Sequence, residues 1–236
     1  MGPRIDRNTR RQGILLVVLG LAALAPLSSP ARGETGQAVW DREYQIKAAF
    51  VYNFIKFVVG GRFGTDQDKP ATDADPNRVI RVGVVGAVPS RKGFLELQGK
   101  LAKDKPIEVR FFDSLKEFQD PEKEVLPSHP QMGEMRRCHV LFLCPSEKPF
   151  LAALLPPLQT EGILLVGDSP GFLEAGGVIN LLIEDKKVRF EINLAAAGRA
   201  KLQIRSSLLR LAVRTVEHDH LERQDDEGKQ TKSKRS

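Results

Sequence analysis

Residues that carry most enzyme chemistry are scarce in this sequence, which has four histidines and two cysteines among its 236 residues. The zinc-protease pattern H-E-x-x-H, the redox pair C-x-x-C and the phosphate-binding P-loop do not occur. His218 and His220 lie in a charged stretch that lacks the further ligands and fixed geometry of a metal site. With no nucleophile–base pair to nominate, we predict no catalytic residue, no metal and no cofactor, and expect that the protein is not an enzyme.

Long apolar runs are also missing, apart from one near the N-terminus. This run, Gly13–Ala25, follows four arginines within the first eleven residues. A helix of that length rises about 20 Å, which is short of the roughly 30 Å hydrocarbon core of a bilayer. The pattern is typical of a secretory signal that is cleaved after Ala31, so that residues 1–31 are removed; cleavage after Gly33 fits nearly as well. We therefore expect a periplasmic protein without direct membrane insertion; the alternative is an uncleaved signal anchor.

A strong charge of one sign is absent once this signal is removed. The whole chain carries +6, and residues 1–31 hold four Arg and one Asp, which leaves +3. No stripe of Lys and Arg interleaved with aromatic residues occurs, so we expect no nucleic-acid partner. Residues 217–236 mix acidic and basic side chains with one apolar residue, Leu221. We predict a disordered charged tail there, because such a stretch cannot bury enough apolar surface.

Apolar runs alternate with segments of helix length in the rest of the chain. Apolar residues at spacings of three and four predict a helix over 41–59, with Asp41 as its N-cap and Gly60-Gly61 as its stop. Strands are expected at 79–85, 107–112, 139–143 and 162–166, separated by helix-length segments at 90–103, 114–124 and 147–158. This alternation predicts βαβ units and a buried parallel sheet.

The pattern changes near the C-terminus. Two strand-like runs, 178–183 and 188–192, are joined by a short charged turn, which predicts an antiparallel hairpin. Asn193 is a good N-cap for a last helix, whose apolar residues keep helical spacing over 196–215. We therefore predict an α/β fold, a single compact domain over 41–216. It has a mainly parallel sheet with βαβ units, a C-terminal antiparallel hairpin and flanking helices.

Two features could serve contacts with other molecules or merely the fold. Phe50, Phe54 and Phe57 widen the apolar face of the first helix, which is either deeply buried or touches a partner. Asp168 and Ser169 follow a predicted strand, where open α/β sheets place their ligands. These two residues could bind a small molecule, or they could cap a short helix that begins at Pro170.

Cys138 and Cys144 flank a predicted strand. Six residues of strand separate their Cα atoms by about 20 Å, whereas a disulfide needs roughly 4.4–6.8 Å. A bond between them would require that the strand prediction be wrong. Either both are buried thiols, or one is an exposed thiol able to link two chains in an oxidising compartment.

Four segments resemble one known family, the YfiR-like periplasmic proteins. They are EYQIKAAFVYNFIKFV (43–58), IRVGVVGAVP (80–89), CHVLFLCPSE (138–147) and the most specific block, ILLVGDSPGFLEAGGVINLLIEDKKVRFEINLAAAGRAKLQIRSSLLRLA (163–212). The resemblance implies a compact α/β fold, export to the periplasm, no enzymatic activity and a tendency to form homodimers. Its best-known member represses an inner-membrane diguanylate cyclase by binding its periplasmic domain, which lowers cyclic-di-GMP output.

The resemblance also implies redox-sensitive disulfides, but this chain departs from that pattern. The family cysteine that corresponds to Cys138 can pair with a cysteine in the first strand, and the matching position here is Gly83. A second family pair falls near Phe172 and Ile179, where this chain has no cysteine. Redox control by that route is therefore not expected here.

Two functions follow as hypotheses. The first is a non-enzymatic regulator that binds the periplasmic part of an inner-membrane signalling protein, a diguanylate cyclase or a sensor kinase. Its predicted partner contacts, beside the aromatic residues of the first helix, are Phe172, Glu174, Asn180, Arg189 and Glu191. The second is a periplasmic small-molecule binding module that uses the crevice near Gly167–Gly171.

Overall fold

The computed structural model of the protein describes residues 36–64, 78–119 and 128–217. The predicted signal peptide at 1–31 and the charged tail after Glu217 lie outside these residues. Within the described ranges, no helix is both long and apolar enough to span a membrane.

The elements follow the chain in an α/β order. The α-helices are α1 (Gly36–Phe57), α2 (Lys92–Leu95), α3 (Met132–Met135), α4 (Leu151–Leu154), α5 (Leu194–Arg199) and α6 (Ser206–Leu209), and the 3-10 helices are η1 (Gly61–Phe63), η2 (Leu115–Phe118) and η3 (Pro145–Phe150). The strands are β1 (Val58–Gly60), β2 (Ile80–Val85), β3 (Leu101–Ala102), β4 (Lys105–Phe112), β5 (Val140–Leu143), β6 (Leu164–Gly167), β7 (Ile179–Glu184), β8 (Lys187–Asn193), β9 (Leu202–Ile204) and β10 (Arg214–Val216).

Eight of the described strands form one sheet in the order β10-β8-β7-β6-β5-β2-β4-β3. The five strands β7, β6, β5, β2 and β4 are parallel to one another. The predicted hairpin is confirmed, since β7 and β8 pair antiparallel from Ile179 opposite Ile192 to Glu184 opposite Lys187. The fold class predicted from the sequence, a mainly parallel α/β domain with a C-terminal hairpin, is therefore confirmed.

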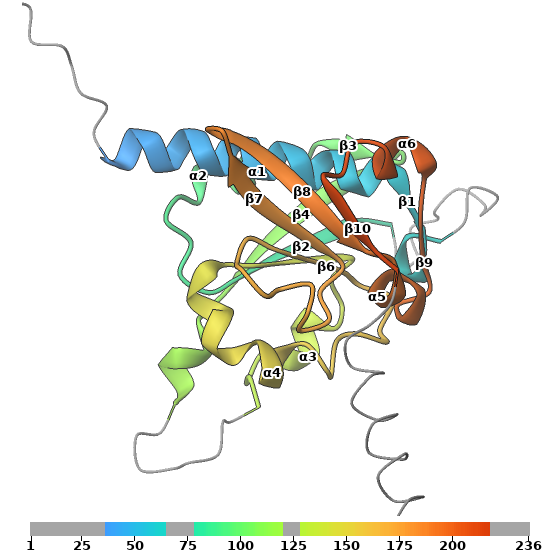
Figure 1. Cartoon of the computed structure of the whole chain (residues 1–236). Helices are drawn as coiled ribbons and strands as arrows, with labels where there is room; N and C mark the ends of the chain where they lie inside the picture. The colour runs from blue at the N-terminus through green and yellow to red at the C-terminus, as the bar shows by residue number, and fades with distance from the viewer. Residues whose placement is uncertain (1–35, 65–77, 120–127, 218–236) are drawn as a thin grey trace, which may run out of the picture. The chain divides into compact units, whose positions relative to one another are not determined.

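The central strands are covered on both faces, as Figure 1 shows, with α1 and α2 on one side of the sheet and α3 and α4 on the other. Every residue of β5 and β6 is buried, which explains their continuous apolar sequences. Phe142 of β5 packs its ring against Tyr44 of α1 and Phe94 of α2. Fully burying a side chain of this size stabilises the fold by about 1.5–3 kcal/mol.

The first helix is present but begins earlier than predicted. Because α1 starts at Gly36, Asp41 lies inside the helix and is not its N-cap, which corrects that prediction. Its phenylalanines serve the fold: Phe54 is fully buried, and Phe50 is half-buried against the rings of Phe54 and Phe190. Phe57 is also half-buried against the core.

The prediction of one long last helix over 196–215 is wrong. Asn193 does cap a helix, since its side chain accepts a hydrogen bond from the Ala196 backbone N–H at 2.9 Å. That helix, α5, ends at Arg199, and Lys201 takes a left-handed backbone with φ 55°. The chain then forms β9, which pairs antiparallel with β1. Helical spacing alone could not reveal this, because the pairing partner lies at the far end of α1.

The helix-length segments between the parallel strands hold less helix than their length suggests. The segment 90–103 contains α2 and also β3, which pairs antiparallel with β4. The segment 114–124 contains η2, and 147–158 contains α4 together with most of η3.

Candidate functional site

The strand order reverses direction between β2 and β5. From β2 the chain crosses to β4 on one side and then returns to β5 on the other side. In open α/β sheets, ligands bind outside the carboxyl ends of the strands at such a switch point. Beyond the ends of β2, β5 and β6 lie Gly86 and Ala87, then Cys144, Pro145 and Ser146, and finally Asp168.

Close contacts hold these strand ends together. The Ala87 backbone N–H donates a hydrogen bond of 2.9 Å to the Ser146 hydroxyl, which donates to the buried Glu147 carboxylate at 2.8 Å. Gly86 has a φ of 99°, and a Cβ there would lie 2.4 Å from both Ser146 Oγ and Glu147 Oε1. Glycine is therefore required at this position for the two loops to meet.

A pocket of about 350 Å³ opens beside these strand ends. Its walls come from α1, from the loops after β2, β5 and β6, and from β7. The lining residues are Trp40, Glu43, Tyr44, Lys47, Ala87, Pro89, Pro145, Ser146, Asp168, Leu181, Leu182 and Ile183. This volume lies at the lower end of the range of about 300–1,000 Å³ that is usual for small-molecule sites.

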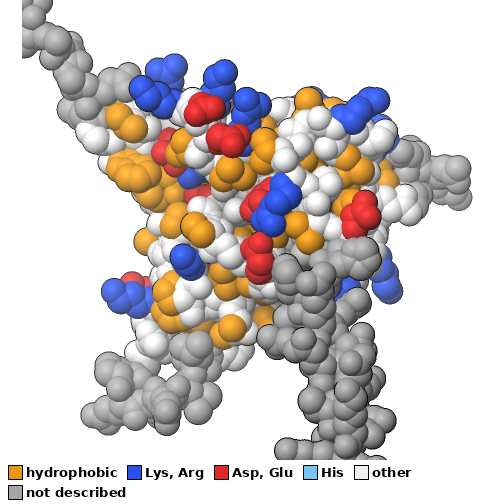
Figure 2. Space-filling view, in the orientation of Figure 1, with side chains coloured by type: hydrophobic (Ala, Val, Ile, Leu, Met, Phe, Trp, Pro, Cys, Tyr) orange, Lys and Arg blue, Asp and Glu red, His pale blue; other side chains and the backbone are white. Residues whose placement is uncertain are grey.

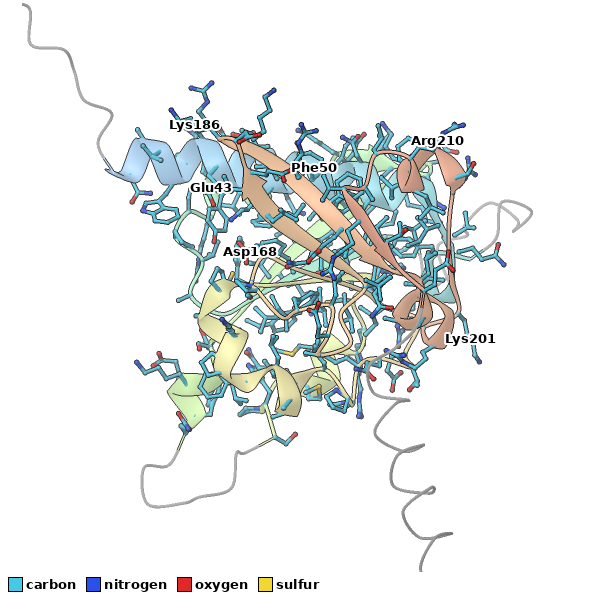
Figure 3. All side chains as sticks on the ribbon, in the orientation of Figure 1. Glu43, Phe50, Asp168, Lys186, Lys201 and Arg210 are labelled. Carbon is cyan, nitrogen blue, oxygen red and sulfur yellow. The ribbon has the colours of Figure 1, made fainter. Side chains whose placement is uncertain are left out.

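A buried ion cluster lines the pocket on its polar side. The Lys47 ammonium lies 2.6 Å from Asp168 Oδ2 and 2.5 Å from Glu43 Oε1, one helical turn earlier. The Tyr44 hydroxyl donates a long hydrogen bond of 3.4 Å to the same Asp168 oxygen. Figure 3 shows Glu43 on α1 and Asp168 in the interior beneath it. We call Glu43, Tyr44, Lys47 and Asp168 the Lys47 cluster.

In the Lys47 cluster one ammonium group pairs with two carboxylates, and burial and these charges together shift the pKa values of Lys47, Asp168 and Tyr44. Burial raises the pKa of Asp168 above its ordinary value, although Lys47 and Tyr44 counteract part of the rise. Burial by itself would lower the pKa of Lys47, but the charges and hydrogen bonds of Asp168 and Glu43 outweigh it and raise that pKa. Burial and the Asp168 charge together raise the pKa of Tyr44. Lys47 and Tyr44 therefore keep their protons at neutral pH.

Two buried oxygens at the end of β6 have no hydrogen-bond partner among the described residues: Asp168 Oδ1 and Ser169 Oγ. The Asp168 side chain is 1% exposed, yet it lines the pocket. An unsatisfied buried carboxylate oxygen costs free energy, so Asp168 Oδ1 retains the capacity to accept a hydrogen bond.

The segment Gly167–Gly171 also matches the pattern G-x-S-x-G of a nucleophile elbow, which our sequence reasoning missed. The structure does not support that role. Ser169 is buried, and turns follow it in place of the helix of an elbow. The two described histidines make their hydrogen bonds away from Ser169. The His129 ring bonds the backbone of Asp113 and Gln131, and the His139 ring accepts a hydrogen bond from the Arg81 backbone N–H. Neither is hydrogen-bonded to Ser169. The alternative in which Pro170 begins a capped helix is wrong as well, since these residues form turns.

Of the residues predicted to contact a partner, some are buried in the fold and others lie at the surface. Phe172 is fully buried beneath Gly167 and Gly177, so it serves the core and cannot offer a contact surface, which corrects that prediction. Asn180 is also buried: its side chain accepts from the Ser169 backbone N–H at 3.1 Å and donates to Glu191 at 3.0 Å. It therefore ties the loop after β6 to the hairpin.

The remaining predicted contacts reach the surface. Glu174 and Glu191 both pair with Arg214 of β10, at 3.1 and 2.6 Å. Arg189 is exposed on β8. The structure thus brings Asn180, Glu174 and Glu191 into one polar group, whereas Asp168 belongs to the pocket beneath α1.

Both cysteines are buried free thiols, which is the first of the two alternatives considered for them. Burial raises the pKa of Cys138 to about 12 and that of Cys144 further, so neither is a reactive thiolate at neutral pH. A Cβ added at Gly83 would lie 3.1 Å from Cys138 Sγ. The first-strand position and Cys138 are therefore neighbours in this chain, although glycine replaces the cysteine. Among the described residues, no group of three or more metal-ligating side chains gathers.

The sequence reasoning missed Trp40, Glu43, Tyr44 and Lys47 as pocket residues. One signal could have found them: Lys47 occupies an apolar position of the first helix, next to Ala48 and one turn from Tyr44. Lysine is almost never fully buried unless it is paired. A lysine on a buried helix face therefore indicates a carboxylate partner, and Glu43 lies at the favourable i,i+4 spacing.

An apolar groove adjoins the pocket on the surface. It has a volume of about 520 Å³ and runs between α1 and the tip of the hairpin. Its lining residues are Val39, Arg42, Glu43, Ile46, Ile183, Lys186, Lys187 and Val188. Val39, Ile46 and Ile183 are 47%, 41% and 56% exposed. In Figure 2, apolar side chains gather on this side of the molecule between Lys and Arg side chains. We call this feature the α1–hairpin groove.

Comparison with known proteins identifies the family. The profile of a family described as YfiR/HmsC-like matches residues 44–213, which include most of α1, the whole pocket after Glu43 and both strands of the hairpin. The chain belongs to the YfiR/HmsC-like family. The resemblance stated from the sequence segments is therefore confirmed.

Solved structures resemble this YfiR-like chain more distantly. A conserved domain protein from Vibrio cholerae O1 biovar El Tor is 14% identical, with a TM-score of 0.43. An ABC domain in complex with L-Trp from Streptococcus pneumonia is 12% identical, with the same TM-score. Each match covers 58% of this chain and 55% of the other, so this chain spans only about half the length of these structures. A comparison with curated proteins finds no match.

Proposed function

We propose that this protein is a non-enzymatic periplasmic regulator that binds the periplasmic part of an inner-membrane signalling protein and modulates its output. The observation that carries the proposal is membership of the YfiR/HmsC-like family over residues 44–213. That family points to regulators of diguanylate cyclases rather than to enzymes. The partner is a diguanylate cyclase or a sensor kinase, and cyclic-di-GMP is the output in the first case.

The α1–hairpin groove supports this proposal as the docking surface. Three aliphatic side chains that are about half exposed line this one groove, and exposed apolar surface gathered in one place is typical of protein-binding sites. Lys186 and Lys187 line the same groove, and its carboxylate, Glu43, is paired with Lys47. We therefore expect the partner to present an apolar segment flanked by acidic residues.

A pair of matched variants tests this docking surface. Ile183→Asp places a negative charge in the groove. The control Leu211→Asp places the same charge outside the groove, at a side chain that is 66% exposed. Each tagged protein is incubated with solubilised membranes of its host, and the recovered proteins are identified by mass spectrometry. We expect the wild type and Leu211→Asp to recover a membrane protein with a periplasmic segment and a cytoplasmic signalling domain, and Ile183→Asp to lose it. Equal recovery by both variants would show that the partner docks on another surface. Arg189→Glu would then test the exposed face of the hairpin.

Export is the second part of the proposal and needs its own test. We propose that residues 1–31 direct the chain to the periplasm and are removed. Fusion of alkaline phosphatase after residue 40 should give enzyme activity, because that enzyme folds only after export. N-terminal sequencing of the purified product should begin near residue 32. A product that retains residue 1 and remains in the cytosol would contradict the periplasmic assignment.

A further inference from the structure

The Lys47 cluster leaves negative charge uncompensated at the pocket. Of the described residues that line it, Lys47 is the only one with a cationic side chain, while Glu43 and Asp168 are both carboxylates. The Lys47 ammonium is already bound to both, and it lies 4.6 Å from the centre of the Tyr44 ring. An anionic ligand would have to displace these contacts. A cationic ligand would supply the charge that the cluster lacks.

A second observation concerns the hydrogen bonds of the Asp168 carboxylate. Asp168 Oδ1 is buried and accepts no hydrogen bond from the described residues, although the other oxygen of the same carboxylate contacts both Lys47 and Tyr44. A buried carboxylate oxygen normally has a donor. A hydrogen bond from a charged donor is shorter and stronger than one from a neutral donor. An ammonium group matches this atom in both charge and hydrogen-bonding capacity.

The other walls indicate the rest of the ligand. Pro89, Pro145, Leu181 and Ile183 offer only apolar side-chain surface, and Trp40 is 45% exposed at the pocket. Indole is the aromatic side chain that attracts cations best, and it also packs flat against apolar or ring-shaped groups. The pocket therefore combines an acceptor for an ammonium group with a surface for an apolar body.

We propose that this pocket, at the carboxyl ends of β2, β5 and β6, binds a small organic cation: a primary amine carried on an apolar body. The ammonium group binds at the carboxylates of Glu43 and Asp168, and the apolar body packs between Trp40 and the side chains of β7. This site adjoins the α1–hairpin groove and shares Glu43 and Ile183 with it, but the proposal does not depend on the regulatory function proposed above.

Three probes of nearly equal shape test the ligand class. They are 2-phenylethylamine, which is cationic, 2-phenylethanol, which is neutral, and 3-phenylpropionate, which is anionic. Binding to the purified chain that begins at residue 32 is measured by calorimetry at pH 7. We expect the amine to bind at least about tenfold more tightly than either other probe, which is the scale of one charge-assisted hydrogen bond. An anion that binds as tightly as the amine, or no binding by any probe at millimolar concentration, would overturn the proposal.

Variants locate the site. Asp168→Asn should remove the preference for the amine over the alcohol, while Glu174→Gln, an exposed carboxylate paired with Arg214, should keep it. Should Asp168→Asn fail to fold, Trp40→Ala serves instead, since that side chain is half exposed and its loss leaves the core intact. Trp40→Ala should weaken all three probes severalfold. Amine binding that is unchanged in Trp40→Ala would place the site elsewhere and refute the assignment.

Discussion

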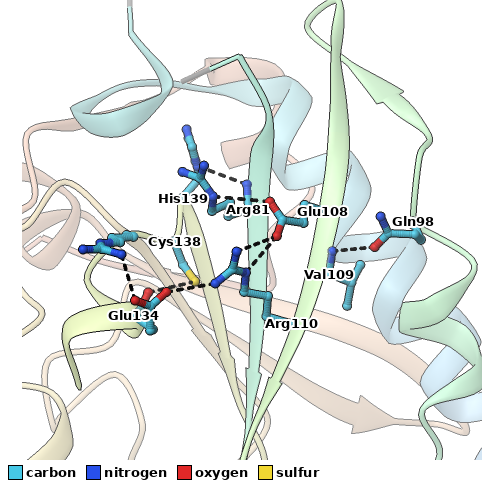
Figure 4. A network of polar contacts seen from close by, with 9 residues as sticks. Arg81, Gln98, Glu108, Val109, Arg110, Glu134, Cys138 and His139 are labelled. Atoms are coloured by element: carbon cyan, nitrogen blue, oxygen red, sulfur yellow. Dashed lines mark hydrogen bonds and ion pairs between the residues drawn. The ribbon is translucent and has the colours of Figure 1, made fainter. Parts of the chain in front are cut away.

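Two groups of charged side chains lie on opposite faces of the same sheet, and they differ in their exposure to water. The Lys47 cluster lies beneath α1 at the carboxyl ends of the strands. On the other face, Arg81, Glu108, Arg110 and Glu134 form the network in Figure 4. We call this second group the Arg110 network. Its Arg110 pairs with Glu108 at 2.7 Å and with Glu134 at 2.9 Å, distances close to those in the Lys47 cluster.

Equal distances do not mean equal energies in these two groups. The side chains of Lys47 and Asp168 are 6% and 1% exposed, whereas those of Arg110 and Glu134 are 41% and 42% exposed. Water screens the exposed pairs, so each contributes about 0–1 kcal/mol. Removing one partner of a buried pair leaves a charge without solvation and is far more costly. We infer that burial decides which of the two groups the fold depends on.

The largest effect should come from Lys47→Met. This substitution leaves Glu43 and Asp168 without their cation, and we expect a loss of about 3–5 kcal/mol in the free energy of unfolding. Urea unfolding followed by circular dichroism measures it. The control Lys56→Met changes an exposed lysine of the same helix and should cost no more than about 0.5 kcal/mol. A loss below 1 kcal/mol for Lys47→Met would mean that burial does not distinguish the two groups.

Packing beneath the Arg110 network should matter more than its charges. A Cβ at Gly83 would lie 2.6 Å from Leu141 Cδ2 and 2.7 Å from Phe112 Cε2. We expect Gly83→Ala to cost about 1–3 kcal/mol through overpacking, measured by the same urea titration. Gly133→Ala is the matched control, because nothing lies within 4 Å of the added Cβ and the residue is in helix α3. That control should be neutral or slightly stabilising, and an equal loss in both variants would contradict the packing explanation.

The pH dependence of stability gives a second test of the buried Lys47 cluster. Since burial raises the pKa of Asp168 in the folded state, its contribution is fully present below the unfolded value near 3.8 and is lost as pH rises through the folded value. The stability of the wild type relative to Asp168→Asn should therefore fall as pH rises from about 4, and it is followed up to pH 7. The fall amounts to about 1.4 kcal/mol for each tenfold difference in proton affinity between the folded and unfolded states. Thermal unfolding across this range measures it, and a relative stability that increases with pH would show that Lys47 dominates.

The smallest effect should come from Arg110→Met. Loss of its two ion pairs should change the free energy of unfolding by about 0–1 kcal/mol, because all three side chains are substantially exposed. A double-mutant cycle with Glu108→Gln isolates the pair, and its coupling energy should decrease further in 1 M salt. A coupling energy above 2 kcal/mol would mean that the Arg110 network stabilises the fold as strongly as a buried ion pair, which would contradict the comparison with the Lys47 cluster.

Local patterns predicted much of the fold. The apolar runs located β2, β4, β5 and β6 to within two residues at each end, and the charged turn located the hairpin. The N-cap role of Asn193 was also predicted correctly, because capping depends on neighbouring residues. The structure at the end of the domain was not predicted correctly. The apolar spacing over 196–215 fits a helix, but the chain there forms β9, which pairs with β1.

The candidate site was predicted only in part. Asp168 was nominated because it follows a strand, and it does line the pocket. Phe172 and Asn180 were nominated as contacts, but both are buried. Burial of a residue after a strand depends on what packs over it, and no local pattern carries that information.

By itself, the sequence determined the alternation of buried strands and connections, the hairpin, the scarcity of catalytic side chains and the family. The tertiary structure decided that Lys47 meets Asp168, 121 positions away, and that the strand ends and α1 enclose a pocket. The physical reason is that strand and helix patterns arise from interactions between near neighbours along the chain. The charge balance and burial of a site depend on residues that come together only when the sheet is assembled.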